Sequence, residues 1–162
     1  MNSRSASGAP GHSGVALDEV SKAIIAELQH DGRRSYAAIG KVVGLSEAAV
    51  RQRVQRLVDS GVMQVVAVTD PMQLGFARQA MIGVRASGEL RPIADAIAAL
   101  DEVDYVVITA GTYDLLVEVV CESDEALLDV LSNKIRTIPN VVSTETFMYL
   151  ELRKQTYSWG VR

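Results

Sequence analysis

The sequence has little cysteine, few aromatic residues and no long apolar run. Its single cysteine, Cys121, excludes an intrachain disulfide and a thiolate zinc cluster, and it fits a reducing compartment. No stretch approaches the roughly 18 apolar residues that a membrane span needs, and the N-terminal segment lacks the apolar core of a secretory signal. We therefore expect a soluble, cytoplasmic protein without a membrane partner.

Residues that carry out catalysis are also scarce. The two histidines, His12 and His30, share no catalytic motif with Cys121. Gly40-Lys41 lacks the other residues of a phosphate-binding loop, and the dinucleotide-binding pattern of three glycines is absent. The sequence predicts no catalytic residue, no metal site and no enzyme activity.

The charges are divided unevenly over the 162 residues. The formal net charge is −4, but residues 1–78 contain nine Lys/Arg against seven Asp/Glu, whereas residues 79–162 contain seven against thirteen. This division indicates two parts with different functions. Two small domains would each be marginally stable alone, so self-association is expected.

The first part has the pattern of a small helical domain. Residues 1–14 are small, polar and glycine-rich, and we expect a disordered tail. Apolar spacing and capping residues predict helices over 18–29, from Ser35 to Gly44, and over 46–60, with Gly44 at a sharp corner. The β-branched residues from Val62 to Thr69 predict one or two short strands as a wing. Residues 15–70 would then form a winged helix-turn-helix domain.

The third predicted helix carries the candidate DNA-binding residues. Val50, Val54 and Leu57 form an apolar stripe, and polar and basic residues occupy the rest of the helix. In a helix-turn-helix, small residues let such a helix enter the major groove while basic residues meet the flanking phosphates. Base edges are assigned to Glu47, Ala48, Arg51 and Gln52, and phosphates to Ser46, Arg53 and Arg56. The alternative is that these arginines are only a solvated helix face.

The second part alternates between strand and helix patterns. Strands are predicted over 79–86, 103–110, 115–121 and 141–152, with helices over 90–100 and 124–138. This order is the βαββαβ arrangement of a ferredoxin-like domain, so the chain is predicted to be an α+β protein. Residues 71–78 would be a linker, 79–152 the second domain, and 153–162 a C-terminal tail whose Tyr157 and Trp159 have no assigned role.

The middle strands indicate self-association. Both 103–110 and 115–121 are more continuously apolar than a half-exposed antiparallel sheet requires. We expect helices to cover one face of the sheet and another subunit to cover the other. The resulting homodimer would hold two DNA-binding modules at a fixed separation.

Together these motifs resemble the Lrp/AsnC (feast/famine) family of transcription regulators. The resemblance covers about residues 15–157 and depends on the order of several short motifs. They are Leu17-Asp18, Ile39-Gly40, Val43-Gly44-Leu45-Ser46, Val50, Arg53-Val54, Arg56-Leu57, Gly61-Val62, Asp70-Pro71, Leu74-Gly75, Gly111-Thr112-Tyr113-Asp114, Ile138-Pro139, Thr144 and Thr146. It implies a winged helix-turn-helix, a ligand-sensing ferredoxin-like domain, and dimers that often assemble further, so that tetramers and octamers both remain open.

The resemblance also implies a site for an amino acid or related effector at the Gly111–Asp114 turn. The chemistry agrees, because glycine exposes backbone N–H groups to a carboxylate and Asp114 can pair with an α-amino group. Thr144 and Thr146 lie two apart on a strand, project to one face and can offer hydroxyls. The effector-binding set is therefore Gly111, Thr112, Tyr113, Asp114, Thr144 and Thr146.

The sequence thus predicts a sequence-specific regulator that binds double-stranded DNA and responds to an amino-acid-like effector. The alternative is a ligand-binding or architectural assembly protein with little specific DNA activity. An enzyme is the least favoured class.

Overall fold

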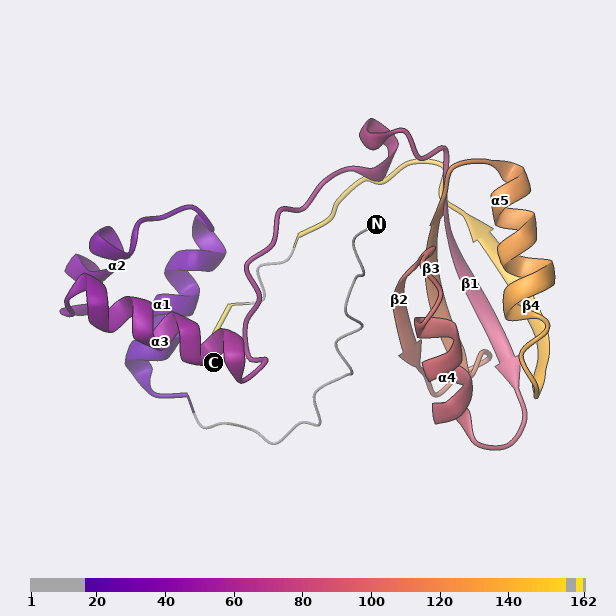
Figure 1. The fold of residues 1–162 in the computed structure, drawn as a ribbon, viewed down its shortest axis with the longest axis horizontal. Coiled ribbons are helices and arrows are strands. Elements are labelled where there is room, and N and C mark those ends of the chain that lie inside the picture. Colours follow the sequence, from indigo (N-terminus) through magenta and orange to yellow (C-terminus); the bar gives the residue numbers. More distant parts are fainter. Residues whose placement is uncertain (1–16, 157–159, 162) are drawn as a thin grey trace. The chain divides into compact units, whose positions relative to one another are not determined.

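The computed structural model describes residues 17–156 and 160–161. The chain divides into two compact units, a helical unit up to residue 67 and an α/β unit over 68–153 (Figure 1). The predicted tail over 1–14 and the aromatic residues Tyr157 and Trp159 lie outside the described residues. No helix in the described part of the chain is long and apolar enough to cross a membrane.

The helical unit consists of α1 (Glu19–His30), α2 (Tyr36–Val43) and α3 (Glu47–Asp59), as the capping pattern predicted. Each helix begins after a side-chain cap, because Asp18, Ser35 and Ser46 each accept a hydrogen bond from a backbone N–H of the first turn. The apolar faces of the three helices form one core, which contains Ile24, Leu28, Ile39, Val50 and Val54.

The predicted wing strands do not form, and this part of the prediction is corrected. Residues 62–70 contain no strand, and Val65, Val66 and Val68 are each more than half exposed. β-branched residues favour extended backbone, but a strand also needs a partner to pair its N–H and C=O groups. The run of β-branched residues does not show whether the folded chain offers such a partner strand. The segment then ends at the short 3₁₀ helix Pro71–Leu74, which Asp70 caps.

The α/β unit has the predicted βαββαβ order. Its elements are β1 (Arg78–Ala86), α4 (Leu90–Ala98), β2 (Val103–Ile108), β3 (Leu115–Cys121), α5 (Asp124–Asp129) and β4 (Val141–Met148). The four strands form one antiparallel sheet in the order β2-β3-β1-β4. Several elements are shorter than predicted, and the second helix continues from α5 into a π-helical stretch, Val130–Ile135.

Both helices pack on the same face of this sheet (Figure 1). The core between them includes Ile82 and Val84 of β1, Val117 of β3, Ile97 of α4 and Leu127 of α5. The strand register places alternate residues on the opposite face, where Tyr105 is 51% exposed and Phe147 is 44% exposed. The prediction that helices cover one face is confirmed, and the other face is open in the single chain.

Candidate nucleic-acid interface and effector loop

The corner between α2 and α3 depends on two glycines. Gly44 has φ 71°, a left-handed conformation that glycine adopts without steric cost, and its N–H donates to the Gly40 carbonyl. At Gly40 the two backbones come so close that a Cβ atom would overlap the carbonyl oxygen of Leu45. Leu45 in turn donates its N–H to the Gly40 carbonyl at 2.9 Å, which holds the corner closed.

Beyond this corner, α3 presents two distinct faces. Val50, Val54 and Leu57 are buried, as predicted. Nearly all of the predicted DNA-binding residues are exposed, and they follow one another along the outer surface of the helix. They are Ser46, Glu47, Ala48, Arg51, Gln52 and Arg56. A helix with this division of faces can lie against another surface without disturbing its own core.

Arg51 is the basic residue nearest to the start of α3, and it has two neighbours. Its Nη2 lies 2.7 Å from Oε1 of Glu47, one turn earlier in the helix. Its guanidinium carbon lies 5.3 Å from the centre of the Tyr36 ring, which belongs to α2. The side chain is still 64% exposed, so it is oriented by these contacts and remains accessible.

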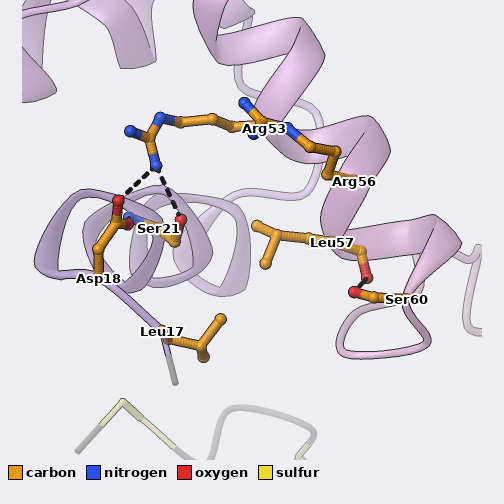
Figure 2. A pocket seen from close by; sticks show the side chains of 7 residues that line it. All are labelled: Leu17, Asp18, Ser21, Arg53, Arg56, Leu57 and Ser60. Carbon is orange, nitrogen blue, oxygen red and sulfur yellow. Dashed lines mark hydrogen bonds and ion pairs between the residues drawn. The ribbon is translucent and has the colours of Figure 1, made fainter. Parts of the chain in front are cut away.

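Arg53 lies differently from the other arginines, because its guanidinium group is paired within the helical unit. Its Nη1 donates to Oδ2 of Asp18 at 2.7 Å and to Oγ of Ser21 at 3.2 Å (Figure 2). The residue is half-buried between α3 and the start of α1. Arg53 therefore joins α3 to α1. Its half-buried position could have been predicted from the sequence, because a rotation of 100° per residue places Arg53 only about 40° around the helix axis from the buried Leu57.

The Asp18 carboxylate carries out two structural functions at once. It caps α1 by accepting the N–H of Ser21 at 2.7 Å, and it pairs with Arg53. Hydrogen bonds from Ser21, and then from Arg53, hold its pKa at about 2. The charged form is thus favoured by local contacts that join two helices.

Arg56 lies beside a hollow of about 440 Å³ that is also lined by Leu17, Leu57 and Ser60 (Figure 2). Its Nε donates to the Gln52 carbonyl of its own helix at 3.4 Å, and the residue is exposed. Unlike Arg53, Arg56 therefore keeps an outward position.

In the α/β unit, the predicted effector turn is a loop between β2 and β3. The backbone N–H of Thr109 donates to the Asp114 carbonyl at 2.9 Å, and the Thr109 hydroxyl donates to the Tyr113 carbonyl at 2.5 Å. Gly111 and Thr112 are exposed at the tip, and the space around Gly111 is open. Backbone groups at the tip are accessible to a ligand.

Asp114 ties this loop to the sheet. Its N–H donates to the carbonyl of Val84, and its Oδ2 accepts the N–H of Ala86 at 2.8 Å. Both bonds are to β1. One carboxylate oxygen is therefore committed to the backbone of the protein, a contact that the turn pattern did not predict.

Tyr113 lies on the open face of the sheet, where it contacts four residues that the sequence analysis missed, namely Gly83, Arg85, Glu145 and Phe147. The ring covers Gly83, where a Cβ would lie 2.7 Å from ring atoms, and its hydroxyl donates to Glu145 of β4. This hydrogen bond is the main cause that raises the pKa of Tyr113. Arg85 lies 5.8 Å from the ring centre, and Phe147 meets the ring edge-on at 6.0 Å.

Thr144 and Thr146 share one face of β4, as predicted, but it is not the face that holds Tyr113. Thr146 pairs with Ile82, and Thr144 pairs with Val84, whose side chains are in the core beneath the helices. The Thr144 hydroxyl accepts a hydrogen bond from Nε of Arg136 at 2.8 Å. Within one chain, the predicted effector set is therefore divided between the two faces of the sheet.

Among residues 17–156 and 160–161 there is no group of three His, Cys, Asp or Glu side chains placed to hold a metal. Cys121 is buried in β3, and burial raises the pKa of its thiol, which leaves it in the unreactive protonated form.

Comparison with known proteins gives consistent matches to both units. Residues 17–58 match the AsnC-type helix-turn-helix domain, and residues 79–162 match a C-terminal dimeric alpha+beta barrel domain. The chain is 35% identical over 144 residues to HTH-type transcriptional regulator FL11 of Pyrococcus horikoshii, a match that covers 88% of this chain and 95% of the relative.

Solved structures agree in fold. The leucine response regulatory protein LrpA of Mycobacterium tuberculosis matches with a TM-score of 0.77 at 29% identity, over 86% of this chain and 96% of that one. A transcriptional regulator of Neisseria meningitidis, solved in complex with L-Met, matches with a TM-score of 0.73 at 22% identity, over 88% and 95% of the two chains. Two matched domains in the expected order, and a relative that aligns over nearly its whole length, show that the chain belongs to the Lrp/AsnC family of HTH-type transcriptional regulators.

Proposed function

We propose that the protein is a sequence-specific regulator that inserts α3 into the major groove of double-stranded DNA. The observation that carries the proposal is the exposed surface of α3, which presents Arg51, Gln52 and Arg56 while the apolar stripe of the same helix is buried. Arg51 and Gln52, near the start of the helix, are placed for base edges. Arg56, a turn further on, suits a phosphate. Arg53 is assigned to the framework because it is paired with Asp18.

A dimer would present two such helices. The matched C-terminal domain is described as dimeric, and the open sheet face of this chain carries Met81, Val107 and Phe147. We propose that a second protomer covers this face and that further assembly gives tetramers or octamers. Two α3 helices on one side of the DNA would read half-sites about one helical turn, roughly 34 to 36 Å, apart.

We further propose that an amino acid or related metabolite binds at the Gly111–Asp114 loop. The exposed backbone at Gly111 suits a carboxylate, and the second carboxylate oxygen of Asp114 is available for an α-amino group. The L-Met complex of the Neisseria meningitidis regulator supports this class of ligand. Because Thr144 and Thr146 lie on the opposite sheet face, they would join the same site only from another protomer.

Such a ligand would act on DNA binding through assembly. It can shift the equilibrium between assemblies only if its affinity for them differs, and the resulting change in DNA affinity follows by linkage. The proposal assigns this chain no catalytic step. Its place of action would be the cytoplasm, where bacterial and archaeal DNA is found.

The DNA proposal is tested by removing the outward charges of α3. Arg51→Ala and Arg56→Ala should both weaken binding to genomic fragments, and Arg56→Ala, which removes the proposed phosphate contact, should also lower the salt dependence of log affinity by about 1. Arg91→Ala is the matched control, because it removes an exposed arginine from α4 in the other unit. Equal binding by all three variants and the wild type would remove the roles assigned to Arg51 and Arg56. A wild-type protein that retards no genomic fragment at low ionic strength would favour an assembly protein with little specific DNA activity.

The effector proposal is tested by a thermal-shift screen of the twenty amino acids followed by calorimetry. Asp114→Asn keeps an acceptor for the Ala86 N–H but removes the charge, so it should weaken effector binding and leave DNA binding without effector unchanged. Asp95→Asn, an exposed position on α4, is the control. Unchanged effector affinity in Asp114→Asn would exclude the proposed pairing with the amino group.

A further inference from the structure

Tyr36 has a position that the proposed DNA contacts do not explain. It is the first residue of α2, it is half-buried, and its ring packs against the core of the helical unit. The same ring lies 5.3 Å from the guanidinium carbon of Arg51 on α3. Tyr36 thus contacts both the core of the helical unit and the arginine that the proposed function places at a base edge.

The Arg51 side chain remains 64% exposed beside the ring, so its guanidinium group is accessible. A guanidinium group stacks on an aromatic ring through its flat face, whereas its N–H donors point outward in its own plane. In Arg51, Nη2 donates to Glu47, and the remaining donors are not used by the contact with the ring. A planar pair of donors matches O6 and N7 of guanine in the major groove.

Two restraints of different kinds thus orient one side chain. An exposed ion pair with Glu47 would by itself confine Arg51 only weakly, because water and salt screen it. The Tyr36 ring is anchored in the core and limits the same side chain from a second direction. An arginine that is already oriented loses less conformational freedom when it binds.

We propose that Tyr36 is a positioning residue for base recognition, which holds Arg51 in the orientation that pairs with a guanine. The inference rests on the proposed DNA-binding function and adds to it the base class that Arg51 reads. Tyr36 itself need not touch the base. Its effect is on discrimination between bases and not on the general attraction to phosphates.

The test uses the full-length protein and an operator selected from random double-stranded DNA. Affinities are measured for the operator, for every single base-pair substitution in it, and for unrelated DNA. Arg51→Ala should lose about 5- to 100-fold of discrimination, the range expected for one bidentate base contact, at one G·C pair in each half-site. Tyr36→Leu should lose discrimination at the same pair, by a smaller factor of roughly 3 to 10.

Two further variants separate positioning from simple structure. Tyr36→Phe keeps the ring and should restore discrimination to within about twofold of the wild type. The double variant Tyr36→Leu with Arg51→Ala should discriminate no worse than Arg51→Ala alone, because both changes remove the same interaction. Thermal melts of each variant confirm that the helical unit is folded.

The outcomes distinguish this inference from the function on which it rests. If Arg51→Ala loses discrimination while Tyr36→Leu retains it, the inference is overturned and DNA binding stands. If Tyr36→Leu weakens all sequences equally, or if Tyr36→Phe behaves like Tyr36→Leu, the ring does not position Arg51 as proposed. If no variant, including Arg56→Ala, changes binding to any DNA, the proposed function itself fails.

Discussion

The close approach at Gly40 predicts that a substitution which usually stabilises a helix will here destabilise the protein. Alanine in place of glycine inside a helix normally gains about 0.5 to 1 kcal/mol. In Gly40→Ala the new methyl group would overlap the Leu45 carbonyl oxygen and lie 3.5 Å from the carbonyl carbon. Those atoms are backbone, so a rotamer change cannot relieve the overlap, and the corner before α3 has to open.

Forcing an extra methyl group into a packed site costs about 1 to 3 kcal/mol. After the gain in helix propensity is subtracted, Gly40→Ala should lower the free energy of unfolding by about 1 kcal/mol, and by about 2.5 kcal/mol at most. For a small domain, a loss of about 1 kcal/mol corresponds to a fall in melting temperature of roughly 4 to 8 °C. Because α3 follows the corner directly, DNA affinity should fall together with stability.

Gly32→Ala provides the matched comparison in the same unit. A Cβ at Gly32 would lie 3.8 Å from the Leu28 carbonyl oxygen, which is an ordinary contact. This variant should be neutral or stabilised by about 0.4 to 1 kcal/mol through the unfolded state. Urea unfolding of both variants at one protein concentration measures the difference. Equal stability of Gly40→Ala and Gly32→Ala would refute the argument from the corner.

Two further predictions concern ionisable side chains. Because the folded-state pKa of Asp18 is lowered from 3.8 to about 2, its contribution to stability is complete above pH 4 and is lost as the pH falls towards 2. Asp18→Asn keeps a side-chain cap for α1 but removes the titrating carboxylate. The difference in free energy of unfolding between the wild type and Asp18→Asn should therefore shrink as the pH falls from 4 to 2, as measured by unfolding at a series of acid pH values. A constant difference over this pH range would contradict the prediction. On the open sheet face, Gly83→Ala should displace the ring of Tyr113 and break the hydrogen bond from the Tyr113 hydroxyl to Glu145, so the pKa of Tyr113 should return towards 10. Tyrosine absorbance during a pH titration measures this, with Tyr113→Phe as the reference. An unchanged titration of Tyr113 in Gly83→Ala would contradict the contact between the ring and Gly83.

Much of the fold was predictable because its signals are local. Ser35 and Ser46 bond to N–H groups only three residues away, and Gly44 adopts a conformation that its lack of a side chain permits. The order of strands and helices follows from apolar periodicity in the same way. These features needed no knowledge of the folded chain.

The site was less predictable because its contacts join distant parts of the sequence. The helix-turn-helix pattern placed Arg53 among the phosphate-binding candidates, yet its partner Asp18 lies 35 residues earlier. The same is true of Tyr113, whose partner Glu145 is 32 residues later on another strand. Neither pairing leaves a local pattern.

The sequence alone determined the helices and the strands of the sheet, and which face of α3 points outward, since these depend on residues within a turn or two of each other. Only the tertiary structure decided that Arg53 pairs with Asp18, on which sheet face Tyr113 and Thr144 lie, and that residues 62–70 find no strand partner. Those outcomes depend on which distant groups are brought within hydrogen-bonding or van der Waals distance, and periodicity along the chain carries no information about that distance.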